Sequence, residues 1–573
     1  MKKLRFIICV IVGLSFFSCN EDEWLEEKPY TFRAPGDSYE TTTDFKQAVN
    51  FMYEMLRYWH FRYQDEASGM QQYLYIGGDL FYHGWPNQLD HFLNRYDTYI
   101  VSNNNLVYQD WSFNYQVIAK ANDVLTMLET NASKVSEADK VTFRAEALFF
   151  RGFYYRKLAH VWGGVPIITE MLTSPKIDAT RATREEVYEQ ARQDLEEAVR
   201  ALNNIDEVKD GALNKQLAQH VLAEVYMSQG NYTKAIELCN AVINHPRMAL
   251  MTERYGDYKD DNTKDVFYDL FRHNNAQRSK GNTEALYVLQ YDYQNGSPNI
   301  RNLSRYIMPQ VRTALIPKSR GSSETVSAAV DFTDEWGGRG NGYWTTTHHF
   351  RKTVWGADFD NDIRNSEYNI YRDYPVDNIN AEGHGQWIVK DGWLRDQDTF
   401  NFVYPAVTKF CAFDNYPANA YQLNPDGTRK LTALGYHMLI AGDGAITSNK
   451  DEYLYRLAET YLLLAEGYVR NSQPQLAADA VNVVRNRANA TPATAAEMDI
   501  DYILDERIRE LCGEEPRNIT LFRMGEFVRR AQKYNPTRAY IGNWQNLWPI
   551  PYGEIEKNIG AELTQNPGYA STN

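Results

Sequence analysis

Apolar side chains recur every three or four positions through residues 142–169, which is the pattern of a helix with one buried face. The positions concerned are Phe143, Ala147, Phe150, Tyr154, Leu158 and Val161. Gly163-Gly164 predicts the end of this helix, because glycine adopts the backbone conformations that terminate helices, and Val165-Pro166 predicts an extended exit. We expect some of the charged residues among the apolar ones to pair inside the protein: Arg144, Glu146, Arg151 and Arg156. Spacing alone fits the core helix of any all-α protein equally well.

Helical spacing also predicts helices over residues 43–57 and 111–125. Residues 77–87 lie between them and read GGDLFYHGWPN, which is too rich in glycine and aromatic residues for a helix. We therefore expect a surface loop there.

Two distant segments repeat one spacing of small and aromatic residues. Leu222-Ala223-x-x-Tyr226 precedes Ala235-x-x-x-Cys239, and Leu464-Ala465-x-x-Tyr468 precedes Ala477-x-x-x-Val481 at the same interval. Both fit the middle of the tetratricopeptide pattern, in which a small residue lets two antiparallel helices approach closely. Gln219 and Tyr461 stand where that pattern prefers tryptophan, so both copies are degenerate, and chance helical similarity is the alternative interpretation.

Helical periodicity is scarce between residues 251 and 450, where Gly, Asn, Asp, Tyr and Trp are frequent. Short strands are predicted at 287–293 and 432–440, and loops over most of the rest. Aromatic side chains are more readily exposed in irregular segments than in helices. Five tryptophans lie in this stretch: Trp336, Trp344, Trp355, Trp387 and Trp393.

The N-terminus has the features of a secretory leader. Three basic residues precede an apolar run over residues 6–17, which is too short to span a bilayer. Ser18-Cys19 ends the run, and a cysteine in this place resembles the lipidation site of bacterial lipoproteins, although Phe16 replaces the usual leucine. We expect Cys19 to carry a lipid anchor; a secreted protein with no lipid is the alternative. Removal of the leader takes away three basic residues and no acidic one, so the formal charge would change from -15 to -18.

Composition narrows the classes of ligand. The net charge of -15 on 573 residues argues against nucleic acid, since phosphate binding is driven by Lys and Arg. An aromatic content of 14%, with 41 Tyr and 12 Trp, exceeds what a core usually needs and favours aromatic side chains at a binding surface. Cys239, Cys411 and Cys512 are widely separated and show no C-x-x-C spacing, so we expect neither a disulfide framework nor a zinc site.

Three motifs together point to a family. The helix predicted within residues 142–169 reads R-A-E-A-x-F-x-R-x-[FY]-Y-Y and is followed by G-G-V-P. Near the C-terminus stands E-R-x-x-E…G-E-x-x-R-x-x-x-L-x-R-x-G, with Thr520 where many family members have aspartate. The chain closes with P-I-P-x-x-E at 549–554 and Q-N-P-G-Y at 565–569. These motifs resemble those of the SusD-like (RagB/SusD) family of nutrient-binding outer-membrane lipoproteins.

The resemblance implies a non-catalytic protein that captures an oligosaccharide, polysaccharide or other nutrient on loops projecting from helical repeats. It further implies delivery to a SusC-like TonB-dependent transporter at the outer membrane. It does not carry over which residues bind, because the binding loops vary among members. A helical-repeat scaffold with no sugar binding of its own is the main rival interpretation, and an enzyme is the third.

No residue set supports catalysis. Glu514-Glu515 are adjacent and cannot flank a scissile bond from two sides. Asp358-x-Asp360-x-Asp362 begins like a calcium loop, but Ile363 and Asn369 replace the turn glycine and the bidentate glutamate, so a solvated acidic turn is favoured. His348-His349 cannot chelate one metal with the helical i, i+4 spacing. We expect no cofactor and no metal.

Sugar binding calls for flat aromatic faces with polar side chains beside them. Two stretches offer both, near residues 79–87 and 336–355. The alternative for each tryptophan is a loop anchor that packs inward. The predicted ligand-binding residues are Asp79, Tyr82, Trp85, Asn87, Trp336, Trp344 and Trp355.

The patterns combine into a mostly α fold in which tetratricopeptide-like helical repeats form a single large body with a loop-rich irregular insert and few short strands. We expect a signal peptide at 1–18, a tether at 19–40, an N-terminal helical part at 41–250, an aromatic-rich ligand-binding insert at 251–450 and a C-terminal helical part at 451–573. The protein would be lipid-anchored at the outer membrane and face the cell exterior.

Overall fold

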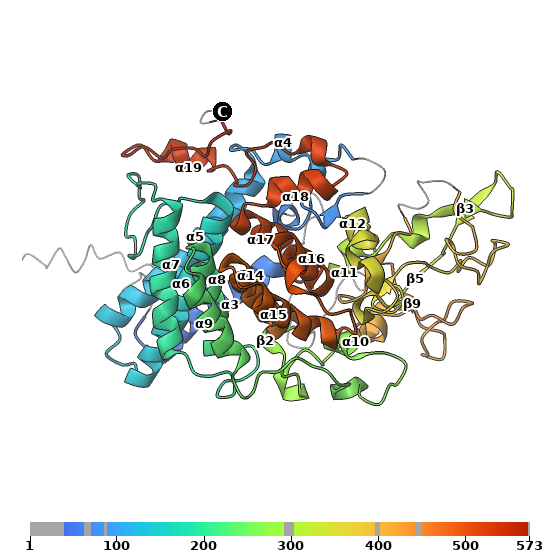
Figure 1. Ribbon diagram of the computed structural model, residues 1–573, viewed down its shortest axis with the longest axis horizontal. Helices are drawn as coiled ribbons and strands as arrows, with labels where there is room; N and C mark the ends of the chain where they lie inside the picture. Colours follow the sequence, from blue (N-terminus) through green and yellow to red (C-terminus); the bar gives the residue numbers. More distant parts are fainter. Residues whose placement is uncertain are drawn as a thin grey trace, which may run out of the picture.

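The computed structural model describes residues 39–61, 70–84, 89–291, 303–395, 402–441 and 450–570. Cys19, Trp85 and Asn87 lie outside these residues. Within them the protein is mostly α-helical, as the sequence predicts. Figure 1 shows helices α5 to α9 side by side at one end, α14 to α18 in the centre, and the irregular insert with β3, β5 and β9 at the other end.

The helix predicted within residues 142–169 is α6 (Glu137–Trp162), and it lies at the centre of the N-terminal part. The Ser136 side chain accepts a hydrogen bond from the Asp139 N–H at its start, and Gly163 ends it at a positive φ of 75°. Its neighbours are α5 (Asn105–Thr130) and α7 (Arg184–Ala201). The arginines of α6 pair as expected: Arg151 lies 2.7 Å from Asp194 of α7, and Arg156 contacts Glu224. These buried ion pairs therefore connect α6 to α7 and to the helix that contains Glu224.

The two predicted repeats are both antiparallel helix pairs. The first is α8 (Lys215–Ser228) with α9 (Tyr232–Ile243), and the second is α14 (Leu457–Arg470) with α15 (Pro474–Arg487). Helix α14 also packs against α9, so the two copies are neighbours in space. The small residues that the pattern requires are fully buried at these contacts, Ala235 in one copy and Ala477 in the other.

The C-terminal family block forms α16 (Ile500–Leu511) and α17 (Arg517–Met524), joined by the buried pair Glu514-Glu515. Arg507 of α16 contacts Glu515 and lies 2.6 Å from Glu459. Thr520, which replaces the family's aspartate, donates a hydrogen bond of 3.0 Å from its hydroxyl to Glu515. Buried arginine–carboxylate pairs thus hold this block together, and Arg507 and Glu515 each have more than one partner.

The insert consists of short elements. The strand predicted at 287–293 is β2 (Ala285–Leu289), which pairs antiparallel with β10 (Glu452–Arg456). The strand predicted at 432–440 is reduced to β9 (Met438–Leu439), because Gly435 turns the backbone at φ 87° and the partner β5 (Phe332–Thr333) is equally short. The other strand pairs are β1 (Phe81–Tyr82) with β6 (Thr345–Thr346), β3 (Leu315–Pro317) with β4 (Thr325–Ser327), and β7 (Ile370–Tyr371) with β8 (Ala406–Val407).

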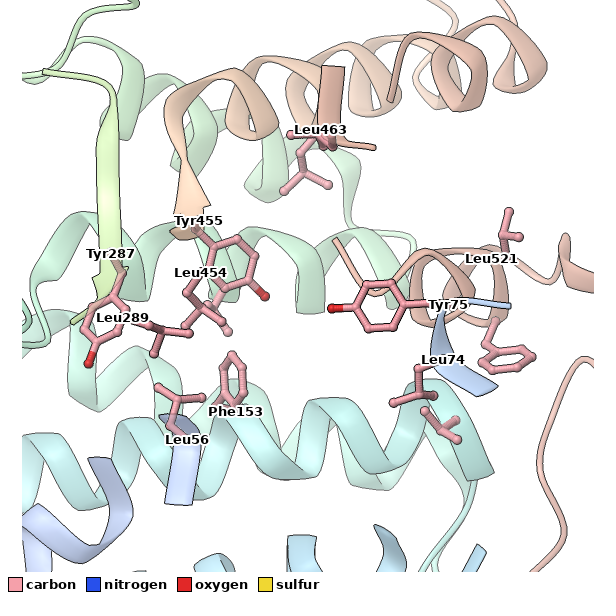
Figure 2. Packing of buried hydrophobic residues seen from close by; sticks show 14 of the residues in the cluster. Leu56, Leu74, Tyr75, Phe153, Tyr287, Leu289, Leu454, Tyr455, Leu463 and Leu521 are labelled. Atoms are coloured by element: carbon pink, nitrogen blue, oxygen red, sulfur yellow. The ribbon is translucent and has the colours of Figure 1, made fainter. Parts of the chain in front are cut away.

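One large apolar core joins these parts. Figure 2 shows Leu56 of α3 (Thr42–Phe61) and Phe153 of α6 pointing toward Leu454 of β10, with Tyr287 and Leu289 of β2 in the same cluster. None of the helices in the described part of the chain combines the length and apolar character needed to cross a membrane. The remaining helices are α4 (Tyr96–Tyr99), α10 (Val266–Leu270), α11 (Leu303–Ile307), α12 (His348–Arg351), α18 (Phe527–Tyr534) and α19 (Tyr552–Lys557).

Candidate functional site

The two stretches predicted to bind ligand meet in space. Strands β1 and β6 pair with Phe81 opposite Thr346 and Tyr82 opposite Thr345. A Cβ at Gly84 would lie 2.3 Å from the Thr345 hydroxyl oxygen, so this close approach requires glycine. Residues near 80 and near 345 therefore form one structural unit, although 260 positions separate them in sequence.

The predicted surface loop is wrong for residues 77–84, which are buried. Asp79 is fully buried there, and its carboxylate accepts hydrogen bonds of 2.9 Å from Arg517 Nε and 2.7 Å from Arg530 Nε. Burial alone raises the pKa of Asp79, but the Arg517 and Arg530 guanidiniums outweigh it and hold the pKa below its usual value. The structure thus gives Asp79 the role of an internal counter-ion for the C-terminal block.

Three of the predicted aromatic residues also lie in the interior. Trp344 has no exposed surface and stacks on Tyr75, with ring centroids 4.6 Å apart. Trp355 is 3% exposed, and its indole N–H donates to the Phe350 carbonyl. Tyr82 is 8% exposed on β1. These side chains are packed inward, which is the alternative that the sequence left open.

Trp336 differs from them, because it is partly exposed among other partly exposed aromatic residues. Its ring centroid lies 5.0 Å from that of Tyr371 and 5.5 Å from that of Tyr436. Contacts continue from Tyr371 to Phe413 at 6.2 Å, from Phe413 to Tyr268 at 6.2 Å and from Tyr268 to Tyr368 at 5.8 Å. We call this set the aromatic strip: Tyr436, Trp336, Tyr371, Phe413, Tyr268 and Tyr368.

Short elements of the insert hold the aromatic strip in place. On β7, Ile370 points into the core and Tyr371 to the opposite side, because side chains alternate along a strand. Gly337 follows Trp336 at φ 73°, where a Cβ would lie 2.6 Å from Cys411 Sγ. Phe413 itself has a positive φ of 45°, which is rare for a bulky residue and marks a strained position. The strained backbone thus lies at the residue whose ring contacts both Tyr371 and Tyr268.

Polar groups accompany the strip. The Tyr371 hydroxyl lies 3.4 Å from the Glu335 carboxylate. Arg272 is 4% exposed, and its guanidinium lies 4.0 Å from the Tyr268 ring centroid and 4.5 Å from that of Phe413. Its Nε and Nη2 donate to backbone carbonyls, whereas Nη1 has no hydrogen-bond partner among the described residues. Aromatic faces and hydrogen-bonding groups thus occur together here.

The tyrosine hydroxyls of the strip stay protonated at neutral pH. Burial raises the pKa of Tyr371 and Tyr436, and the nearby Glu335 raises both further. Burial also raises the pKa of Tyr268, more than Arg272 lowers it. These hydroxyls can therefore donate as well as accept hydrogen bonds.

Sequence reasoning found only Trp336 of this strip. The other five residues come from four separate segments between 268 and 436. None has a local spacing that distinguishes it from the many other tyrosines and phenylalanines of the insert. The positive φ of Phe413 and the contacts across β7 exist only in the folded chain.

The acidic and histidine candidates for chemistry have structural partners. Asp358 lies 2.6 Å from Arg485, and Asp362 lies 2.6 Å from Arg364, so these two carboxylates are buried ion pairs and the predicted solvated turn holds only for the exposed Asp360. His349 is buried 2.9 Å from Asp505. Glu514 contacts Lys409 at 2.6 Å, in the buried block described above. The remaining cysteines Cys239, Cys411 and Cys512 are free and buried.

Comparisons with known proteins cover almost the whole chain. A family model described as "Starch-binding associating with outer membrane" matches residues 23–227, and one described as "SusD family" matches residues 251–569. Two SusD-like proteins of Formosa agariphila are each 24% identical over 99% of this chain and their full length.

Solved structures show the same fold. A laminarin-binding SusD-like protein superposes with a TM-score of 0.64 at 21% identity, over 93% of this chain and all of that protein. Surface glycan-binding protein A of Bacteroides thetaiotaomicron, solved with laminarihexaose, has a TM-score of 0.63 at 20% identity, over 92% of this chain and 99% of that one.

Proposed function

The chain belongs to the SusD family, and from this membership we propose that it is a cell-surface lipoprotein that captures a glycan and passes it to a SusC-like TonB-dependent outer-membrane transporter. In this proposal Cys19 carries the lipid, the protein sits at the outer membrane facing the cell exterior, and the bound sugar leaves chemically unchanged. Two structural neighbours are described as binding laminarin or laminarihexaose, which makes a β-glucan the first ligand to test.

The aromatic strip is the observation that supports glycan capture by this chain. Pyranose rings present an apolar face, and partly exposed aromatic side chains can stack on it. The Glu335 carboxylate, 3.4 Å from the Tyr371 hydroxyl, and the tyrosine hydroxyls of the strip can pair with hydroxyl groups of such a ligand. The strip therefore offers both the aromatic faces and the polar groups that a sugar needs.

The ligand contacts that we propose are Trp336 and its neighbours in the strip, together with Trp85 and Asn87, which the sequence singles out. For Asp79, Tyr82, Trp344 and Trp355 we propose a supporting role, because their burial leaves little surface for a sugar.

A glycan array with the soluble chain from Asn20 onward tests the proposal, and calorimetry with laminarihexaose gives the first affinity. We expect saturable binding that the double variant Trp336→Ala/Tyr371→Ala weakens. The matched control is Trp387→Ala, which removes a tryptophan that is 39% exposed and lies outside the strip. A wild-type chain that binds no glycan but co-purifies with a barrel protein would favour the scaffold interpretation.

Chromatography after long incubation with the best ligand tests the absence of catalysis. The acids that the sequence offers for catalysis hold buried arginines or lysine, which supports a binding role without chemistry. We expect the oligosaccharide to be recovered intact. New reducing ends that increase in proportion to protein concentration would contradict the proposal.

A further inference from the structure

Three potential metal ligands meet between the two helical repeats. His220 and Glu224 lie four positions apart on α8 and therefore on one helix face, and Glu459 lies in the first turn of α14. One ring nitrogen of His220 and one carboxylate oxygen of each glutamate lie within 4.8 Å of one another. All three side chains are buried, with exposures of 0%, 6% and 6%.

Each of the two glutamates has an arginine partner. Arg156 contacts Oε2 of Glu224, and Arg507 lies 2.6 Å from Oε1 of Glu459. Each of these two contacts uses one carboxylate oxygen. Glu515 contacts Arg507 and also lies 3.1 Å from Arg517, so three carboxylates meet three guanidiniums. The geometry of the potential ligands, and not an excess of negative charge, is therefore the reason to expect a cation here.

His220 has one nitrogen held and the other free. Its Nδ1 lies 3.0 Å from the Thr460 hydroxyl, whereas Nε2 is buried and has no hydrogen-bond partner among the described residues. A buried polar atom without a partner costs stability unless something else satisfies it. When Nδ1 carries the proton and donates to Thr460, Nε2 presents a lone pair, which is the usual arrangement of a histidine that binds metal.

A small cavity adjoins the cluster. Its volume is about 40 Å³, and Glu224, Glu459, Glu515 and Arg156 are among the residues that line it. This space admits a water molecule, which needs roughly 10–15 Å³ by the same measure. A site with three protein ligands and one water has the coordination number that zinc prefers.

We propose that His220, Glu224 and Glu459 bind one Zn²⁺ ion that links α8 to α14. Imidazole with carboxylates suits zinc, whereas calcium and magnesium prefer oxygen ligands alone. The ion would connect the two tetratricopeptide-like units, which are distant in sequence. The sequence argument considered cysteine spacing, adjacent histidines and one calcium-like loop, each within a short stretch, so it missed a set split between residues 220 and 459.

Zinc analysis of the purified chain tests the proposal directly. The protein is stripped with EDTA, loaded with ZnCl₂, passed through gel filtration and analysed for metal by mass spectrometry. We expect about one zinc per wild-type chain and a rise in Tm on loading, because a ligand that binds only the folded state stabilises it. His220→Asn is expected to lose both effects. His348→Asn, which alters an exposed histidine outside the cluster, is the matched control and retains them.

Two further measurements keep the test decisive if His220→Asn folds poorly. Thr460→Val removes the hydrogen bond to Nδ1 and is expected to weaken zinc binding about 10- to 100-fold. Calcium chloride in place of zinc is expected to leave the wild-type Tm unchanged. The proposal is wrong if the wild-type chain retains no zinc after gel filtration, or if folded His220→Asn retains as much zinc as the wild type. In either case Glu224 and Glu459 serve only as partners of Arg156 and Arg507.

Discussion

At the scale of single residues, burial decides which of the predicted site residues can meet a ligand. Asp79 and Trp336 both belong to aromatic, polar stretches of sequence, yet Asp79 is fully buried against two arginines and Trp336 is partly exposed. Substitution at each should therefore affect a different property, namely stability for the first and ligand affinity for the second.

Asp79→Asn is expected to lower the free energy of unfolding by about 3–5 kcal/mol, because it removes the one carboxylate that two buried guanidiniums share. Urea unfolding followed by circular dichroism measures this change. The control Asp360→Asn alters an exposed aspartate and is expected to stay within about 0.5 kcal/mol of wild type. Equal stability of Asp79→Asn and wild type would contradict the assigned role.

The same carboxylate predicts a pH dependence. Its pKa in the folded protein is below the unfolded value of about 3.9, so its contribution to stability is complete above that pH and is lost as the pH falls toward the folded pKa. Unfolding curves of the wild type between pH 7 and pH 2 should therefore lose more stability below about pH 4 than those of Asp79→Asn. Parallel curves for the two proteins would mean that other groups dominate acid unfolding.

Trp336→Ala is expected to raise the Kd for the glycan about tenfold with little change in Tm, because one stacking contact contributes about 0.5–1.5 kcal/mol beyond area burial. Trp344→Ala should behave oppositely and cost about 3–5 kcal/mol of stability, since that side chain has no exposed surface. Calorimetry and thermal melts on both variants distinguish the cases. A loss of stability in both, or of affinity in neither, would remove Trp336 from the site.

At the scale of elements, the two helix pairs contact each other through small residues. Gly467 on α14 lies so close to the other pair that a Cβ would be 3.0 Å from Ile236 Cγ1 of α9 and 3.1 Å from Met227 Cε of α8. The repeat pattern predicts close approach within each pair, and the structure adds this second close approach between the pairs.

Gly467→Leu is expected to destabilise the protein by about 1–3 kcal/mol, because overpacking forces the neighbouring helix to move. Gly553→Leu is the matched control, since a Cβ at Gly553 would meet no atom within 4 Å. Denaturant unfolding of the two variants provides the comparison. A Gly467→Leu variant as stable as the control would show that α9 and α14 can separate at no cost.

At the scale of the whole molecule, the end of the chain returns to its first signature helix. Asn566 donates hydrogen bonds from Nδ2 to the Trp162 carbonyl at 2.9 Å and to the Trp548 carbonyl at 2.6 Å. Trp162 of α6 in turn meets Trp548 edge to face, with ring centroids 5.5 Å apart. The family's closing motif is therefore part of the same core as its opening motif, and the proposed membrane anchor at Cys19 precedes both.

Cys19→Ala is expected to abolish incorporation of labelled fatty acid and to release the protein from membranes. Fractionation of cells that express the variant, with palmitate labelling of the same samples, measures both effects. Cys239→Ala is the control, because that cysteine is fully buried and is expected to leave lipid labelling intact. Lipid labelling that persists in Cys19→Ala would exclude this anchor.

The sequence by itself determined the signature helix with its end at Gly163, the two repeats and the family, because each depends on spacing within short stretches. Only the tertiary structure decided that Asp79 is an internal counter-ion, that Trp344 packs inward, and that Trp336 joins five aromatic residues from distant segments. The physical reason is that periodicity reports which face of a local element is apolar, whereas exposure of a loop residue depends on chain segments hundreds of positions away.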